Sequence, residues 1–294
     1  MREVGPETFF LCFGMPKSGT TFLQRTLNLH PQVSCPSEHN LVHLSGEINK
    51  MLETYKHLLT VMDKRTGGQG ATLPDRAVSL EILHAAALIL SRSAAKARRI
   101  HGLNANGMFF NVNLADSVFR HPKMIAIMRN PVDQARSAWR HNQRLAREEP
   151  ENASAHLALL NNPEGTLDGF AIAHSAHYTA SVTRFLDYAE NRGSFLVVLY
   201  ENLVAHKEAE LRRLFEFLGA DTSNDVIHRI AIASSPEEMA RNSTNPEFFG
   251  FGSTGKEALR VSPHVRERIL KETWPVLGRL AYNMSELMPY IGRT

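Results

Sequence analysis

Near the start of the chain, a short glycine-containing loop lies between an apolar run and a helical pattern. The run at 8–13 is rich in aromatic and aliphatic residues, which is typical of a buried strand. From 19 to 29 apolar residues recur at helical spacing, and the loop in between reads Gly14-Met-Pro-Lys-Ser-Gly-Thr-Thr21. Backbone N–H groups at a helix N-terminus bind anions, and glycine lets the chain wrap closely around them. The loop therefore predicts a site for a phosphate-like anion on an α/β fold.

The order of residues in this loop differs from that of the usual nucleoside triphosphate loop. In the pattern GxxxxGK[ST], a lysine follows the second glycine and reaches the β- and γ-phosphates. Gly14 and Gly19 match the two glycines, but Thr20 stands at the lysine position. The lysine, Lys17, lies earlier and inside the loop. This shift indicates an anion with a shorter tail than a triphosphate.

Apolar runs and helical patterns alternate along the rest of the chain. Short apolar runs predict further strands at 33–35, 108–112, 124–128 and 195–200. Helical spacing predicts helices at 41–62, 75–100, 167–190, 211–218 and 265–277. Alternation of this kind favours a parallel sheet covered by helices on both faces. Because no repeat or linker divides the chain, we expect residues 1–294 to form a single α/β domain with a central parallel β-sheet flanked by helices.

Composition excludes several classes of protein. The 294 residues are 43% hydrophobic and 21% charged, which is typical of folded soluble domains rather than disordered chains. A net charge of +3 does not indicate a nucleic-acid partner, and two cysteines do not make a disulfide framework. No run of about 18 apolar residues occurs, so no membrane span is predicted, and the apolar stretch at 82–90 is expected to be a buried helix. We expect a cytoplasmic protein.

Four segments of the chain resemble the PAPS-dependent sulfotransferases, where PAPS is 3′-phosphoadenosine 5′-phosphosulfate. The segment PKSGTTFL, Pro16–Leu23, is similar to the 5′-phosphosulfate loop of that family. Lys123–Ser137 resembles the family's strand, RxPxDxxxS pattern and following helix. LYENL at 199–203 and GSTGK at 252–256 resemble two later elements of the family. The four segments occur in the family's order, so the resemblance covers nearly the whole chain.

The resemblance implies a P-loop NTPase-like fold and a set of donor-binding residues. The residues implied for the 5′-phosphosulfate are Pro16, Lys17, Ser18, Gly19, Thr20 and Thr21. The residues implied for the 3′-phosphate side of the donor are Arg129, Ser137, Tyr200, Gly252, Ser253, Thr254, Gly255 and Lys256. Lys17 would neutralise the charge on the bridging oxygen as the bisphosphate leaves. A charged fork at the end of a strand and a hydroxyl in the next helix suit a single phosphate.

The reaction that the resemblance implies is in-line transfer of a sulfuryl group from PAPS to a hydroxyl or amine. Adenosine 3′,5′-bisphosphate is the other product, and the family needs no metal. Positioning and electrostatics dominate such a step. A small molecule or a glycan is the expected acceptor, and its identity stays open. A P-loop small-molecule kinase and a non-catalytic nucleotide-binding protein are the alternatives, and the kinase would require Mg²⁺ and a lysine in place of Thr20.

An acceptor hydroxyl must lose its proton, and Glu38 is the favoured base. The spacing from His30-Pro31 to Glu38 resembles that of the members that act on sugars and on protein tyrosine, which use a glutamate. Members that act on phenols and steroids use a histidine near the middle of the chain. His101, His121 and His141 lie in that region, but without a recognisable family context. An acid at this position also stabilises a helix N-terminus, which is the alternative role for Glu38.

Two further sets of residues recur at helical spacing. The basic set, Arg136, Arg140, Arg144 and Arg147, is either a solvated face or, if it lines the cleft, a contact for an acidic acceptor. The set His39, His43 and Glu47 favours a polar face of the acceptor cleft over a metal site. Sugar-acting members carry a KxP element before the 3′-phosphate segment, whereas this chain has FFNVN at 109–113. Acceptor contacts of those members therefore do not transfer to this chain.

Overall fold

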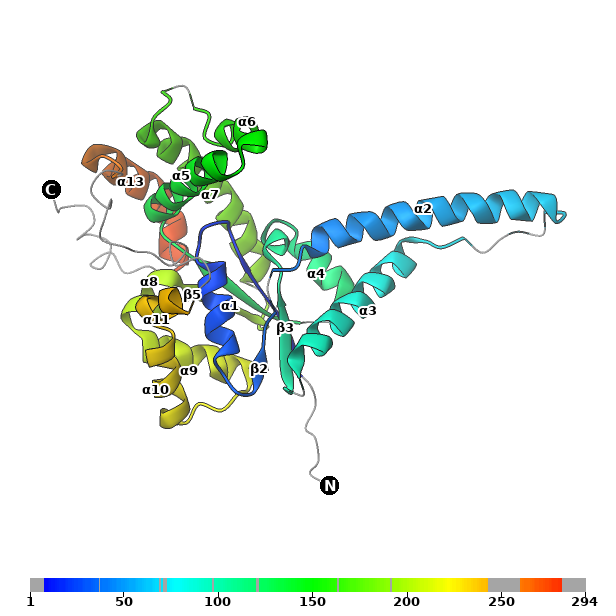
Figure 1. Cartoon of the computed structure of the whole chain (residues 1–294), viewed down its shortest axis with the longest axis horizontal. Helices are drawn as coiled ribbons and strands as arrows, with labels where there is room; N and C mark the ends of the chain where they lie inside the picture. Colours follow the sequence, from blue (N-terminus) through cyan, green and yellow to red (C-terminus); the bar gives the residue numbers. More distant parts are fainter. Residues whose placement is uncertain are drawn as a thin grey trace.

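A five-stranded sheet with the order β2-β3-β1-β4-β5 forms the centre of the computed structural model (Figure 1). The model describes residues 8–36, 38–68, 70, 73–96, 98–119, 122–162, 164–190, 192–242 and 260–281. The strands are β1 (Thr8–Gly14), β2 (Val33–Ser34), β3 (Ile100–Asn104), β4 (Lys123–Met128) and β5 (Phe195–Leu199). Every neighbouring pair is parallel, with Leu11 of β1 between Leu103 of β3 and Met124 of β4. The predicted α/β class with a central parallel sheet is confirmed.

Helices cover both faces of this sheet, because side chains alternate between the faces along each strand. On one face, Leu11 and Phe13 pack in a core formed mainly with α2, α3, α4, α5, α7 and α13. These helices are Leu41–Arg65, Arg76–Ala95, Val112–Val118, Pro131–Glu148, Leu167–Ala189 and Pro263–Arg279. On the other face, Phe10 and Cys12 pack in a second core with α1, α8, α9, α10 and α11. These helices are Thr20–Asn28, Tyr200–Ala205, Lys207–Leu218, Asn224–Ala233 and Pro236–Arg241.

One strand lies earlier in the chain than the sequence predicted. The strand expected at 108–112 is wrong, because Asn106–Phe110 forms a 3-10 turn, η1, and α4 follows it. The strand is instead β3, and all five of its residues are buried. His101 and Asn104 made this segment look polar in the sequence. In the structure both are buried, and Nδ1 of His101 lies 2.9 Å from Oγ of Ser91. The expected helix at 75–100 ends earlier, at Ala95, where Lys96 adopts a left-handed φ of 45°.

The polar segment 148–165 contains two short elements. They are a 3-10 turn, η2 (Pro150–Asn152), and α6 (Ala153–Ala158). Neither element contributes a buried residue, but Leu160, which follows α6, is buried and packs in the core.

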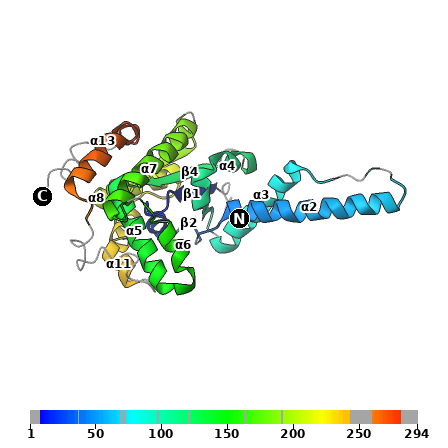
Figure 2. The same cartoon turned by 90° about the horizontal axis from the view of Figure 1, so that it is seen from above.

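Helix α2 extends away from the sheet and the other helices, and α3 lies beside its first part (Figures 1 and 2). The sequence predicted a buried helix at 82–90. One side of α3 is buried as predicted, at Leu83 and Ala87. On its other side Ile89 is 65% exposed. Among the described residues, α3 is the single helix whose length and apolar composition would allow it to cross a membrane. In this structure it packs against β3 and α2.

Candidate functional site

Three parallel strands end at the same edge of the sheet, and each leads into a predicted site segment. β1 leads into the loop 15–19, β4 into Arg129, and β5 into Tyr200. The register pairs Gly14 with Ile127, and Met128 with Leu199, so the three strand ends lie side by side. In open α/β sheets, ligands bind at the carboxyl ends of the strands. The fold therefore gathers segments that are far apart in the sequence at one edge.

The loop 15–19 has the backbone geometry of an anion-binding turn. Lys17 and Gly19 adopt left-handed φ angles of 69° and 100°, on either side of the buried Ser18. Alternation of right- and left-handed residues turns successive N–H groups toward one concavity. A Cβ on Gly19 would lie 2.5 Å from Cδ2 of Tyr200, so only glycine fits there. A Cβ on Gly14 would likewise lie 2.5 Å from the carbonyl oxygen of Ile127.

The side chain of Gln134, on α5, supports this loop through two hydrogen bonds. Its Nε2 donates to the carbonyl oxygen of Pro16 at 2.8 Å and to Oγ of Ser18 at 3.1 Å. Its Oε1 accepts from Nε2 of His174, on α7, at 3.4 Å. Burial lowers the pKa of His174 to about 4, so that ring is neutral. Sequence reasoning missed Gln134, whose available signal was its place between Asp133 and Ser137 in the RxPxDxxxS pattern.

Positive charge is concentrated around Lys17. Burial, together with the charges of Arg144 and Arg129, lowers the pKa of Lys17 to about 8. The carboxylate of Glu38 acts in the opposite direction and raises it. Two further cations and one exposed carboxylate are thus near enough to Lys17 to act on its charge. Such a group favours a bound polyanion, because the anion would relieve the mutual repulsion of the cations.

Arg129 is positioned by contacts between the β4 and β5 ends of the sheet. Its guanidinium carbon lies 4.5 Å from the centre of the Tyr200 ring, and the side chain is 8% exposed. Next to it, the backbone N–H and the Nδ2 of Asn130 both donate to Oε1 of Glu201, at 3.0 and 2.7 Å. Oδ1 of Asn130 accepts from the N–H of Asp133 and caps α5. The two segments therefore hold each other in place.

The predicted basic set on α5 divides between the site and solvent. Arg144 is the member whose charge acts on Lys17, and its side chain is mostly buried. Arg136 pairs with Asp133 at 2.8 Å, whereas Arg140 and Arg147 are exposed. Ser137 lies on the same helix and is half-buried. The set is therefore neither a purely solvated face nor a continuous lining of the site.

The structure brings two candidate bases to the neighbourhood of Lys17. Glu38 lies between β2 and α2, in a segment tied to β3 by the His39 N–H, which donates to the carbonyl oxygen of Asn104 at 2.7 Å. The second is His141, on α5. Burial, followed by the charges of Lys17 and Arg144, lowers the pKa of His141 to about 4. His101 lies in β3 and is buried.

Some predicted site residues lie outside the residues that the structure describes. These are His121 and the whole 3′-phosphate loop of Gly252, Ser253, Thr254, Gly255 and Lys256. Within the described ranges, no group of three or more His, Cys, Asp or Glu side chains is arranged to hold a metal ion. Cys12 and Cys35 are both buried and unbridged, with their sulfur atoms 3.4 Å apart.

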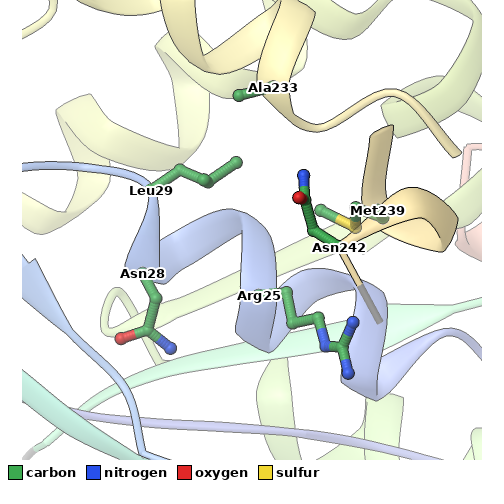
Figure 3. Close-up of a pocket in the computed structure, with 6 residues that line it drawn as sticks. All are labelled: Arg25, Asn28, Leu29, Ala233, Met239 and Asn242. Carbon is green, nitrogen blue, oxygen red and sulfur yellow. The ribbon is translucent and has the colours of Figure 1, made fainter. Parts of the chain in front are cut away.

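A surface pocket of about 260 Å³ lies at the other end of α1 from the loop (Figure 3). Arg25 and Asn28 of α1 and Leu29, which follows the helix, line it together with Ala233, Met239 and Asn242. None of the predicted site residues takes part in this lining. The pocket is therefore separate from the candidate site.

Comparisons with known proteins agree with this arrangement. A family model described as "Sulfotransferase family" matches residues 10–224. Protein-tyrosine sulfotransferase A of Caenorhabditis elegans is 24% identical over 230 residues, which make up 75% of this chain and 52% of that protein. The chain thus spans about half the length of this curated relative.

Two solved structures show the same fold at low sequence identity. The sulfotransferase domain from the Synechococcus PCC 7002 olefin synthase has a TM-score of 0.50 at 16% identity, covering 96% of this chain and 97% of that one. The sulfotransferase domain from the curacin biosynthetic pathway also has a TM-score of 0.50 at 16% identity, covering 95% and 98%. Since the family model spans the loop and the ends of all five strands, the chain belongs to the sulfotransferase family.

Proposed function

We propose that this protein transfers a sulfuryl group from PAPS to a hydroxyl or amine, and releases adenosine 3′,5′-bisphosphate. The observation that carries the proposal is the cation group of Lys17, Arg129 and Arg144 beside a loop with anion-binding geometry. In the reaction, a bond forms between the acceptor atom and sulfur while the bond from sulfur to the 5′-phosphate oxygen breaks. The acceptor proton passes to a base on the protein.

The donor-binding roles follow the edge of the sheet. The 5′-phosphosulfate is assigned to Pro16–Thr21, where Lys17 neutralises the charge that develops on the leaving oxygen. The 3′-phosphate is assigned to Arg129, Ser137 and the loop at 252–256, with the Tyr200 ring supporting Arg129. Membership of the family and the geometry of the loop support these assignments. We assign no metal to the reaction.

For the base we propose Glu38. Its carboxylate is near enough to Lys17 to raise the pKa of that lysine, so both groups can face one reacting centre. It is also exposed, as a group that must meet an incoming acceptor requires. His141 is the second candidate, because its ring is near enough to Lys17 for the two charges to interact, and burial keeps the ring neutral. Glu38→Gln and His141→Asn distinguish the two, since only the loss of the base should abolish turnover at saturating PAPS.

The acceptor is proposed only as a class. A hydroxyl on a small molecule, a glycan or a tyrosine side chain fits the reaction, and the last is suggested by the name of the curated relative. Arg144 near Lys17 favours an acceptor with an acidic group. We further propose a cytoplasmic location. We also propose no nucleic-acid partner, in keeping with the small net charge of +3.

The first experiment compares ligands by thermal shift. Adenosine 3′,5′-bisphosphate should raise the melting temperature more than ATP with Mg²⁺, because Thr20 replaces the lysine that a triphosphate loop needs. A larger shift with ATP and Mg²⁺ would favour the kinase alternative and contradict the proposal. Tight binding of the bisphosphate without turnover of any acceptor would favour the non-catalytic alternative.

The second experiment measures transfer from labelled PAPS to a panel of sugars, phenols and tyrosine peptides. Lys17→Ala should lower kcat/KM by about 10- to 150-fold, the equivalent of about 1.5–3 kcal/mol for a charged contact. Lys271→Ala is the matched control, because Lys271 is an exposed lysine on α13. Full activity in Lys17→Ala would show that the loop is not the donor site.

A further inference from the structure

Helix α2 carries an apolar stripe with an alternating spacing of three and four residues. The stripe begins with Leu41, Leu44 and Ile48, which we call the inner stripe. It continues with Met51, Tyr55, Leu58 and Met62, which we call the outer stripe. This spacing repeats every seven residues, and it is the pattern of positions that meet a partner helix in a coiled coil. No polar residue interrupts the pattern over three repeats.

The two halves of the stripe have different surroundings. Leu41 and Ile48 are buried, and Leu44 packs against the same core. The four outer residues are each between 52% and 54% exposed. Figures 1 and 2 show the reason, since the distal part of α2 extends beyond the body and past α3. A single row of large apolar side chains on a projecting helix is typical of an interaction site.

Helix α3 packs on a different side of α2 from the outer stripe. Oγ of Ser79, on α3, donates to Oδ1 of Asn49, and Leu52 is buried. Asn49 and Leu52 each follow a stripe position by one residue, which places them about 100° further around the helix. The outer stripe is therefore available to a partner while α3 stays in place.

We propose that the outer stripe binds the outer stripe of a second copy of this chain, as an antiparallel coiled coil. With the two-fold axis between residues 56 and 57, Met51 meets Met62 of the second copy, and Tyr55 meets Leu58 of the second copy. Each of these pairs then brings two large apolar side chains together. A parallel pair would place the two bodies at the same end of the paired helices, next to the buried inner stripe, whereas the antiparallel pair places them at opposite ends.

The charges on α2 also suit an identical partner. The positions that flank the outer stripe hold Leu52, Thr54, Leu59 and Val61, so no like charges face each other. Lys50 and Asp63 lie outside these flanking positions, and Lys50 pairs with Glu47 of its own helix at 2.7 Å, so neither charge has to be buried in the contact. A helix that lies on a lipid surface instead has a polar face rich in lysine and arginine. Here Glu47, Glu53 and Asp63 are interspersed with the basic residues, which favours the protein partner.

The mass of the full chain in solution tests this proposal. Light scattering and sedimentation velocity should give twice the 32.9 kDa of one chain. Leu58→Glu should reduce the mass to that of one chain, with the thermal shift by adenosine 3′,5′-bisphosphate unchanged. His57→Glu is the matched control, because His57 is an exposed neighbour outside the stripe and should leave the dimer intact. A monomeric wild type, or a dimer that survives Leu58→Glu, would overturn the proposal.

Cross-linking tests the orientation. In the double variant Met51→Cys with Met62→Cys, oxidation by copper phenanthroline in air should link residue 51 of one copy to residue 62 of the other. The native Cys12 and Cys35 are buried and should not react. Links between identical positions would show a parallel pair and contradict the antiparallel assignment. Sedimentation of a monomeric wild type with vesicles of phosphatidylcholine and phosphatidylglycerol would show that lipid, and not a second copy, covers the stripe.

Discussion

Lys17 combines three properties that are seldom found in one lysine. It lies in a left-handed backbone conformation, it is largely buried, and two arginines act on its charge. Burial and like charge both disfavour a protonated amine, which explains a pKa of about 8. An anionic donor would reverse that penalty, so the loop is suited to gain more from a bound anion than an exposed lysine would.

The pH dependence of the reaction should report this lysine. Lys17 is protonated below pH 8 and loses its charge as the pH rises through about 8, so kcat/KM should fall there. Arg144→Met removes a charge that lowers the pKa of Lys17, and the falling limb should move to higher pH. Arg140→Met, at an exposed position of the same helix, should leave the profile unchanged. A limb at the same pH in Arg144→Met would show that another group titrates.

Gln134 should support the loop without touching the reaction. Gln134→Leu leaves the Pro16 carbonyl and the Ser18 hydroxyl without this donor, at a cost of about 1–3 kcal/mol in unfolding free energy. We expect the KM for PAPS to rise more than kcat falls, because the variant loosens a binding loop. Gln143→Leu, at a half-buried position of the same helix, is the control. Unchanged stability and an unchanged KM would remove the supporting role.

At the scale of elements, α1 starts where the loop meets the end of β5. Gly19 is the N-cap of α1, and its φ of 100° combines with the close approach of the Tyr200 ring. That ring also packs edge-on against Phe22 of α1, at 5.7 Å between centres. The start of the helix and the start of α8 are therefore fixed together.

Gly19→Ala should lose most of the binding of adenosine 3′,5′-bisphosphate. The added Cβ strains the left-handed backbone and also meets the Tyr200 ring, so either the loop or the ring must move. Gly67→Ala is a matched control, since Gly67 has a φ of 106° but no atom within 4 Å of an added Cβ. Calorimetry and thermal melting should show a larger loss for Gly19→Ala, and equal losses would exclude the contact with Tyr200 as the cause.

At the scale of the whole molecule, α7 contacts both the central sheet and Gln134, which supports the loop 15–19. Phe185 of α7 contacts Phe13 of β1, Phe109 of η1 and Phe195 of β5, and it is 1% exposed. The same helix carries His174, which bonds to Gln134 beside the loop. Packing at the centre of the core thus sets the support of the site.

Phe185→Ala should lower the unfolding free energy by about 3–5 kcal/mol, because it leaves a cavity among three aromatic rings. Phe110→Ala should cost much less, since Phe110 is 38% exposed. Urea denaturation followed by circular dichroism measures both. A similar cost for the two variants would mean that the core relaxes around the missing ring.

The sequence alone predicted the elements whose signals are local. The loop Gly14–Thr21, β1, β4 and β5 each follow from a short pattern, and their order along the chain implied the parallel sheet. β3 was missed because its His101 and Asn104 are buried polar residues, and their burial depends on distant partners. The Lys17, Arg129 and Ser137 assignments came from patterns resembling a family, and they stay predictions for the donor contacts.

Tertiary structure decided what depends on contacts between distant segments. It brought Gln134 under the loop, placed Arg144 and His141 near Lys17, and left Arg140 and Arg147 in solvent. It also divided the stripe of α2 into a buried half and an exposed half. The physical reason is the same in each case. Spacing along a helix shows which residues share a face, but only the packing of the whole chain determines what that face meets.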